Sequence, residues 1–546
     1  MILSPFFFRQ PSTFCSRQPT TVNCQLSFPV NRQLSTVNYL MGRLYQLFAF
    51  VSVLCVFNYV WSECKGIRYR KALIAVALST LFFVTIGFKD LSLPYVTYLF
   101  IGIVGIPSIL YGVLYAPDIL LIVAATYIPF NLLLPADFGG IQRAFNGTNV
   151  VLGALFFGYL IIKKKSSTQA GKRSNFAFKF VLLYVVLSMI SYVRGGLIYG
   201  PDYLLGVMFD LKRWLTPFIL MFFFYKIARD REIIKIIYAV FMIVVIVNVF
   251  YGLLEWVELG FGTYSSYLRR LGGINMQPNF YAAFIAYYIC LIIAPFLTCF
   301  RKPSAKFLIF PILLGLRIFI PTNSRGAWLS FPPALLTVCF FKSKLLLLIV
   351  VTAVIISGLY FSILVPDTIR ERFESALDVN KRSGIYSQST ESPVTYLSES
   401  KSVSIRTRAI LLEGGLKMMR VNPWFGMGRF TFPHLIGNYT EGGLRGSAHN
   451  LFLTILCEMG FPALLILVVL LLLLFTNGIY VYRREKDTML KGMVLGFMAS
   501  IPAIIVCNFT GNRFDSVDLI SIFWMLAGCV LRLKDIIHYE RTEELR

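Results

Sequence analysis

The run Phe461-Pro-Ala-Leu-Leu-Ile-Leu-Val-Val-Leu-Leu-Leu-Leu-Leu-Phe475 carries no charged side chain, and it completes an apolar segment that begins near Asn450. A helix of about 20 apolar residues is long enough to cross the hydrocarbon core of a bilayer. Similar segments recur along most of the chain, so we predict spans at 44–61, 72–88, 95–115, 117–134, 148–162, 176–193, 206–225, 233–256, 278–299, 306–320, 327–341, 344–365, 450–475, 489–508 and 517–533.

The composition excludes a soluble globular protein. Of the 546 residues, 57% are hydrophobic and 14% are charged, whereas soluble domains carry about 25% charged residues. The mean hydropathy is +0.70. We therefore predict an all-α polytopic membrane protein, with about 12 to 15 transmembrane helices and one long, partly helical external loop.

Lys and Arg outnumber Asp and Glu by 52 to 27, a formal net charge of +25. A basic excess fits nucleic acid, anionic lipid or cytoplasmic loops, and nucleic acid is the partner that an apolar chain favours least. The basic residues lie on alternate loops, which the positive-inside rule makes cytoplasmic. These loops contain Lys65 to Lys71, Lys163 to Arg173, Lys226 to Arg231, Arg301 to Lys306, Lys342 and Lys344, Arg483 to Lys486, and the residues from Arg532 onward.

Five regions follow from these patterns. They are a polar tail (1–40), an N-terminal transmembrane bundle (41–365), a large periplasmic loop (366–449), C-terminal transmembrane helices (450–535) and a cytoplasmic tail (536–546). The tail is rich in Ser, Thr, Gln and Arg and has no acidic residue or apolar core, so it is no secretory signal. It is either disordered or precedes the true start at Met41, and the alternative is a transit-like targeting segment.

The large loop is predicted to contain two amphipathic helices. Apolar residues recur at helical spacing from Ile369 to Leu377 and again from Ile405 to Met419. Ser404 is the expected N-cap of the second helix, and Asn422-Pro423 is its expected end. The polar, Ser-rich stretch 381–402 is expected to be a linker, and both helices are expected to lie along the outer membrane face.

The ten cysteines stand singly, mostly inside apolar segments, without any C-x-x-C pair. Neither a zinc site nor a disulfide framework is indicated. We expect no metal and no cofactor.

The positive-inside rule disfavours Lys and Arg on the external side of a membrane protein. Basic residues on the predicted external side are therefore the best candidates for a functional role. A guanidinium binds two phosphate oxygens at once, which Lys cannot do. Arg325 is the best placed, because it lies in the short external turn Pro321-Thr-Asn-Ser-Arg-Gly-Ala-Trp328. The alternative for any one of them is a local ion pair or contact with lipid phosphate. The external basic residues are Arg194, Lys212, Arg213, Arg269, Arg270, Arg325, Arg406, Arg408, Arg429 and Arg445.

His449 lies in Ser447-Ala-His-Asn450, where the large loop meets the next span. An imidazole with a pKa near 6.5 is the usual proton acceptor in proteins, although a lone interfacial histidine is more often structural. Glu458 and Gly460 follow inside the apolar segment. We interpret both as structural, with Gly460 kinking the helix and Glu458 bonding a neighbouring helix.

Four motifs resemble the O-antigen ligase and polymerase superfamily of bacterial membrane glycosyltransferases. They are Arg269-Arg-Leu-Gly-Gly-Ile-Asn-Met-Gln-Pro-Asn279, Ser324-Arg-Gly-Ala327, Pro423-Trp-Phe-Gly-Met-Gly428, and His449-Asn450 followed by Glu458 and Gly460. Their order matches the family pattern over about residues 200 to 535. The resemblance implies a GT-C-like fold in the bacterial inner membrane, with an active site that faces the periplasm.

The resemblance also implies an activity. A glycan is transferred from an undecaprenyl-diphosphate carrier to a sugar hydroxyl, on lipid A-core in ligases or on another carrier-linked glycan in polymerases. Carried over, His449 is the catalytic base and Arg325 a diphosphate ligand, with Asn450, Ser324 and Gly326 in support. Arg270 with Arg269 matches the family's other arginine, and Arg213 or Arg406 are alternatives.

The chemistry expected of such residues agrees. A positioned base activates a sugar hydroxyl, and arginines stabilise a leaving diphosphate without a metal. Direct displacement inverts the anomeric carbon. Two alternatives from other classes are a transporter or flippase of lipid-linked sugars, which tends to show repeats and charges along a path, and a structural assembly subunit.

Overall fold

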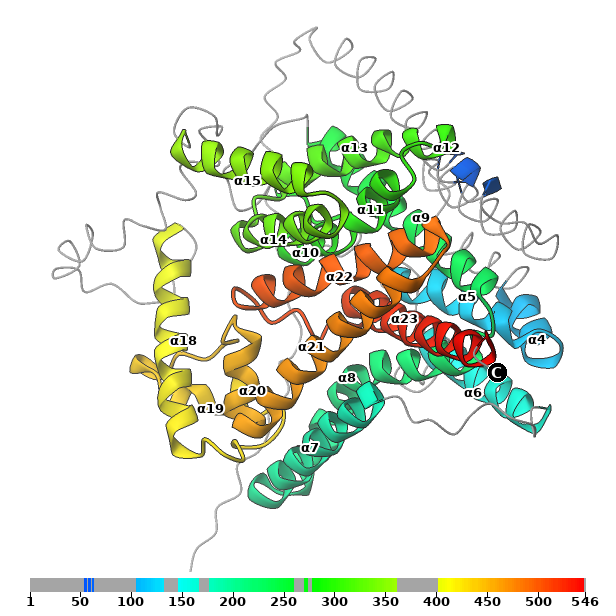
Figure 1. The fold of residues 1–546 in the computed structure, drawn as a ribbon. Coiled ribbons are helices and arrows are strands. Elements are labelled where there is room, and N and C mark those ends of the chain that lie inside the picture. The colour runs from blue at the N-terminus through cyan, green and yellow to red at the C-terminus, as the bar shows by residue number, and fades with distance from the viewer. Residues whose placement is uncertain are drawn as a thin grey trace, which may run out of the picture.

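The computed structural model describes residues 54–55, 57–59, 61–62, 105–131, 146–165, 176–259, 270–273, 277–360 and 401–544. Every regular element in this part of the chain is helical (Figure 1). The predicted fold class, an all-α polytopic membrane protein, is confirmed. The predicted span at 72–88 and most of those at 44–61 and 95–115 lie outside the described residues, as does the predicted helix from Ile369 to Leu377.

The α-helices have the following bounds: α4 Ile106–Leu114, α5 Pro117–Tyr127, α6 Gly147–Lys165, α7 Phe176–Tyr199, α8 Pro201–Ile227, α9 Arg231–Glu258, α10 Pro278–Tyr288, α11 Cys290–Thr298, α12 Pro303–Lys306, α13 Ile309–Phe319, α14 Arg325–Lys342, α15 Lys344–Leu359, α18 Lys401–Val421, α19 Phe432–Leu435, α20 Leu451–Met459, α21 Phe461–Arg484, α22 Thr488–Asn508 and α23 Val517–Glu544. Short 3-10 turns are η2 Ile128–Phe130, η5 Ile320–Thr322, η8 Ile436–Asn438 and η9 Glu441–Gly443.

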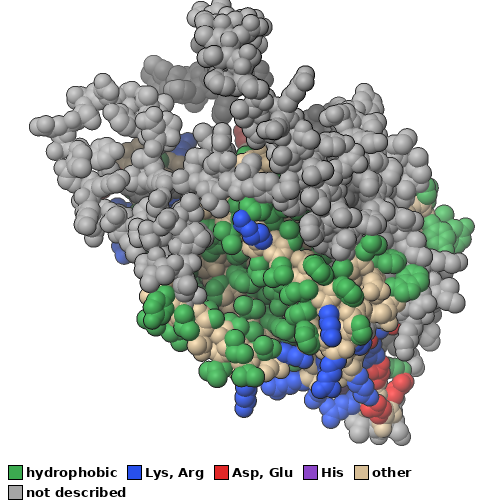
Figure 2. Space-filling model, turned by 90° about the horizontal axis from the view of Figure 1, so that it is seen from above, with side chains coloured by type: hydrophobic (Ala, Val, Ile, Leu, Met, Phe, Trp, Pro, Cys, Tyr) green, Lys and Arg blue, Asp and Glu red, His purple; other side chains and the backbone are tan. Residues whose placement is uncertain are grey.

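Six helical segments among the described residues are long and apolar enough to cross a membrane: Phe176–Tyr199, Arg231–Glu258, Pro278–Thr298, Pro303–Thr322, Phe461–Arg484 and Thr488–Asn508. The apolar part of α9 is completely buried, so α9 lies at the centre of the bundle. On the face in Figure 2, hydrophobic side chains cover the middle of the described surface, and Lys and Arg gather along its lower border. A lipid-facing belt bordered by basic loops has this appearance.

Small residues allow the central helices to approach closely. A Cβ added to Gly496 of α22 would lie 2.9 Å from the carbonyl oxygen of Cys290, and one added to Gly528 of α23 would lie 2.5 Å from that of Met221. Close backbone approach through small residues is typical of helices packed in membranes. In this way α22 packs against α11 and α23 packs along α8, although α8 and α23 are distant in sequence (Figure 1).

One predicted span is interrupted, which corrects the expectation of a single helix. The segment 450–475 divides at Gly460, whose φ of +81° ends α20 and begins α21. Gly460 is a backbone hinge, as expected from its sequence position, because a left-handed φ is tolerated best by glycine. The predicted span 278–299 is one continuous helical segment, because Ile289 between α10 and α11 keeps helical dihedral angles.

The predicted amphipathic helix before Asn422-Pro423 is α18. It begins at Lys401 and not after Ser404, so the expected cap at Ser404 is wrong, while its end at Val421 is confirmed. Its apolar side chains pack against α20 and the following loop in a small core made of Leu411, Met418, Phe432, Ile436, Ala448, Leu453 and Cys457. Proline after Asn422 and this core together fix the helix end.

The bundle has two chemically different ends. At one end, Lys235 of α9 lies 2.8 Å from Asp487, which precedes α22, and Arg532 of α23 donates to the carbonyl oxygen of Ala228. These contacts join three loops that the charge pattern predicts to be cytoplasmic. The C-terminal ends of α9 and α22 lie at the opposite end of the bundle, where the candidate residues gather.

Candidate active site

The turn before Arg325 is fixed by its own backbone. After the 3-10 turn η5, Asn323 adopts a left-handed conformation with a φ of +51°, and α14 then begins at Arg325. Asparagine tolerates this region better than most residues. Within the described residues Ser324 forms no capping hydrogen bond with α14, because its hydroxyl instead donates to Asn279 Oδ1 at 3.1 Å. The helix therefore begins without a cap from the side chain of Ser324, and its first residue, Arg325, is half-buried.

Arg270 holds this turn in place. Its side chain is 9% exposed, and its Nε donates to the carbonyl oxygen of Thr322 at 2.9 Å. Its Nη2 donates to Asn279 Oδ1, also at 2.9 Å. Arg270 and Ser324 thus share one acceptor, and the motif around Arg270 meets the Arg325 turn as the sequence predicted for a common site.

The two glycines after Arg270 anchor their loop to α9. The N–H groups of Gly272 and Gly273 donate to the carboxylate of Glu255 at 2.7 to 3.0 Å. Gly273 has a φ of +55°, and a Cβ there would overlap the ring of Tyr281. The pair of glycines in the motif is explained by this close packing.

Arg513 is a site residue that the sequence reasoning missed. It lies in the loop between α22 and α23 with 4% of its surface exposed. Its Nε donates to the carbonyl oxygen of Asn279 at 3.2 Å, its Nη1 donates to that of Cys507, and its N–H donates to Asn508 Oδ1 at 2.9 Å. The available signal was a polar segment, Asn508 to Asp515, between two apolar spans.

Gly326 brings α14 against the same loop. A Cβ at this position would overlap the hydroxyl of Thr510. On the other side of the loop, the rings of Phe509 and Phe452 lie 4.5 Å apart. Because Phe452 is in the first turn of α20, the loop from Asn508 to Asp515 connects the Arg325 turn to the His449 junction.

His449 is held at the entrance to α20. Its φ is +48°, and its N–H donates to the hydroxyl of Ser447 at 3.3 Å. The side chain of Asn450 caps α20 by accepting from the N–H groups of Phe452 and Leu453 at 3.0 and 3.1 Å. The supporting role expected for Asn450 is thus a structural one, since the cap orients the chain on either side.

The imidazole of His449 is half-buried and has positive charges near it. Burial lowers the pKa of His449 below the ordinary value of 6.5, and the guanidinium groups of Arg408 and Arg513 lower it further. A lowered pKa keeps the imidazole neutral at pH 7. A neutral imidazole can accept a proton, so His449 has the protonation state that a general base requires.

The remaining predicted arginines differ in position. Arg213 is exposed on α8, and Arg406 is in α18, where only its backbone is described. Arg269 lies outside the described residues. Arg270 contacts the turn before Arg325, so the geometry favours Arg270, and not its alternative Arg213, as the second arginine.

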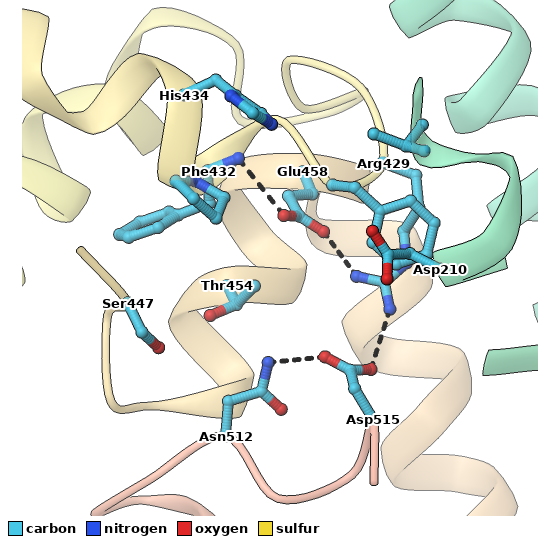
Figure 3. Close-up of a pocket in the computed structure, with 12 residues that line it drawn as sticks. Asp210, Arg429, Phe432, His434, Ser447, Thr454, Glu458, Asn512 and Asp515 are labelled. Carbon is cyan, nitrogen blue, oxygen red and sulfur yellow. Dashed lines mark hydrogen bonds and ion pairs between the residues drawn. The ribbon is translucent and has the colours of Figure 1, made fainter. Parts of the chain in front are cut away.

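A buried ion network beside His449 was also missed. Arg429 is 1% exposed and forms ion pairs with Glu458 and with Asp515, the second at 3.1 Å. Glu458 also accepts from the N–H of Phe432 at 3.3 Å. The interpretation of Glu458 as structural agrees with these contacts, but its partner is the large loop and not a neighbouring helix. The network lines a pocket of about 150 Å³ (Figure 3).

The Pro423 to Gly428 motif places Arg429. The N–H groups of Met427 and Gly428 donate to the carbonyl oxygens of Cys457 and Glu458 at 2.8 and 3.0 Å. A Cβ at Gly426 would overlap the backbone of Glu458. These glycines let the loop lie directly on the C-terminal end of α20.

Residues 309–468 match the protein family described as O-antigen ligase. The matched segment includes Arg325, Arg429, His449 and Glu458, while Arg270 and Arg513 lie outside it. The match confirms the predicted resemblance to the O-antigen ligase and polymerase superfamily. Curated proteins give no match to the sequence.

Proposed function

We propose, with the match to the O-antigen ligase family as the premise, that this membrane protein transfers a glycan from an undecaprenyl-diphosphate carrier to a sugar hydroxyl. The acceptor is lipid A-core in a ligase or a second carrier-linked glycan in a polymerase. The observation that supports this most directly is the half-buried imidazole of His449. Burial and the positive charges of Arg408 and Arg513 lower its pKa and keep it neutral at pH 7. The reaction is assigned to the periplasmic side of the inner membrane.

The donor diphosphate is assigned to the N-terminal end of α14. The N-terminal end of a helix attracts anions through its N–H groups, and the helix dipole adds to this attraction. Arg325, the first residue of α14, supplies a charged fork beside these groups. Arg270 acts differently, because its guanidinium is engaged with Thr322 and Asn279, and we assign it the positioning of the turn.

The reaction is a single displacement. The acceptor hydroxyl loses its proton to His449 as its oxygen forms a bond with the anomeric carbon. The bond from that carbon to the diphosphate oxygen breaks, and the carrier diphosphate leaves with the electron pair. Arg325 and the N–H groups of α14 stabilise the charge that develops on this leaving group. The anomeric configuration is inverted, and no metal is required.

The replacement His449→Asn tests the proposal. Asparagine tolerates a left-handed backbone and preserves the turn, but it cannot accept the proton. We expect turnover to fall by about 10² to 10⁴, with unchanged amounts of protein in the membrane. His538→Asn, near the C-terminal end of α23, is the matched control and should retain wild-type turnover.

The assay uses purified protein in detergent with a carrier-linked glycan and an acceptor panel, and it scores the linked product. Formation of product without a second compartment distinguishes transfer from transport. Wild-type turnover by the His449→Asn variant would refute the catalytic role. Loss of product after addition of EDTA would refute metal independence.

A further inference from the structure

The pocket beside His449 has a different charge from the donor site. Three carboxylates line it, from Asp210 of α8, Glu458 of α20 and Asp515, together with the guanidinium of Arg429 and the imidazole of His434 (Figure 3). By contrast, the proposed donor site consists of Arg325 and the N-terminal end of α14. A diphosphate would be repelled by the carboxylates, so this pocket is suited to a ligand that carries no negative charge.

His449 does not itself line the pocket, but two lining residues are hydrogen-bonded to the His449 junction. Ser447, which lines it, accepts the N–H of His449. Thr454, which lies near Ser447 in the lining (Figure 3), donates to the carbonyl oxygen of Asn450, the residue after His449. A ligand in the pocket would therefore lie next to the His449 junction.

The polar wall has hydrogen-bonding capacity that the described residues do not use. Asn512 donates to Asp515 at 2.7 Å, but its buried Oδ1 has no partner among the described residues. The Nε of Arg429 is likewise buried and without a partner in that part of the chain. Unused buried donors and acceptors are costly, which is a reason to expect a ligand that satisfies them.

The other walls are aromatic. Phe430 and Phe432 line the pocket beside the polar groups. A sugar ring presents hydroxyl groups at its edge and C–H groups on its faces, so it matches a pocket with polar and aromatic walls. The volume of about 150 Å³ is below the roughly 300 to 1,000 Å³ of pockets for drug-sized ligands. One sugar ring is therefore the appropriate size.

We infer that this pocket binds the terminal, uncharged sugar ring of the acceptor and presents its hydroxyl to His449. The inference rests on the proposed glycosyl transfer. It adds a selectivity, because the carboxylates favour neutral sugars over uronic acids. Donor and acceptor are thus assigned to two sites of different charge.

The test measures binding without turnover. Methyl glycosides of glucose, galactose, mannose and N-acetylglucosamine are the neutral probes, and methyl glucuronide is the anionic probe. Saturation-transfer NMR is recorded on the full chain in lipid nanodiscs. We expect wild type to bind at least one neutral glycoside, and methyl glucuronide at least about tenfold more weakly.

Asp210→Lys reverses the charge of an exposed pocket residue, so it leaves the buried network intact. It should weaken the neutral glycoside about tenfold and strengthen methyl glucuronide. Asp202→Lys, on the same helix but outside the pocket, is the matched control and should bind as wild type does. Equal binding of both probes to wild type, no binding of any neutral probe, or identical behaviour of the two Lys variants would overturn the inference.

A third variant separates this inference from the proposed function. His449→Asn should bind the neutral glycoside normally while product formation is lost. Normal turnover with pocket binding intact would refute the catalytic role of His449 alone. Normal turnover in Asp210→Lys with the preferred acceptor would show that the pocket does not hold that acceptor.

Discussion

His449 has a backbone conformation that few side chains tolerate. With a φ of +48° it lies in the left-handed region, where Asn, Asp and His are enriched among residues other than glycine. Asn450 caps α20 immediately afterwards, so the imidazole is directed by a helix start on one side and by Ser447 on the other. Alanine at position 449 would remove the base and strain the turn together, which is why asparagine is the cleaner replacement.

The pH dependence of turnover depends on the charges near His449. Because burial and two guanidinium groups lower its pKa, the acid limb of kcat/KM is expected below the ordinary value near 6.5. Arg408→Gln removes one of these charges, so the pKa of His449 should rise and the acid limb should move to higher pH. Profiles of kcat/KM against pH for the two proteins measure the shift.

Arg420→Gln, an exposed position on the same helix, is the control for this shift and should leave the profile unchanged.

The lowered pKa of His449 also affects the stability of the folded protein. The folded protein binds the proton of His449 less tightly than the unfolded chain does, so this contribution to stability is present above the unfolded pKa. It is lost as the pH falls through the lowered folded pKa. An acid limb that moves to lower pH in Arg408→Gln would contradict the electrostatic argument.

At the scale of residues, the motifs predicted the site only in part. Arg325, Arg270 and His449 stand in short patterns that can be recognised in sequence. Arg513 contacts Asn279, more than 200 positions away in the chain, and nothing near Arg513 in sequence records that contact. The packing of α22 and α23 brings Arg513 near His449, and this packing could not be predicted from the sequence.

At the scale of elements, the start of α14 depends on one glycine. A Cβ on Gly326 would overlap Thr510, so the helix and the loop after α22 approach as closely as glycine allows. We expect Gly326→Ala to destabilise the protein by about 1 to 3 kcal/mol through overpacking. Because the loop carries Arg513, turnover should fall as well.

The partner replacement Thr510→Ala makes this prediction specific. The double variant Gly326→Ala with Thr510→Ala should recover part of the lost thermal stability and turnover, since the overlapping hydroxyl is absent. Thermal unfolding in detergent and product formation are measured for all four proteins. Simple addition of the two single effects would show that the contact does not limit this position.

The helices themselves were largely predictable, because apolar composition identifies spans without any knowledge of packing. Gly460 and Pro462 also marked the break after α20. The start of α18 was predicted wrongly, because Ser404 is a good cap in isolation but lies inside the helix.

At the scale of the whole molecule, the loops with predicted cytoplasmic charges and the loops of the candidate site lie at opposite ends of the bundle. Arg231 lies 3.1 Å from Glu485, and Lys302 donates to Thr488, so loops with predicted cytoplasmic charges meet at one end of the bundle. Arg325, His449 and Arg513 gather where α22 ends. This separation is the arrangement that alternating basic loops predict, although it does not by itself assign either end to a compartment.

Cysteine labelling assigns the compartments. Glu441, in the large loop, and Arg483, at the end of α21, are both exposed, and the seven cysteines among the described residues are all buried. In a background with Cys15, Cys24 and Cys64 replaced by serine, Glu441→Cys should react with a membrane-impermeant maleimide in intact spheroplasts. Arg483→Cys should react only after the membrane is opened. The reverse order would place the His449 site on the side opposite to its proposed lipid-linked donor, and the proposed reaction could not then be periplasmic. Labelling of both in intact spheroplasts would contradict the predicted cytoplasmic position of Arg483.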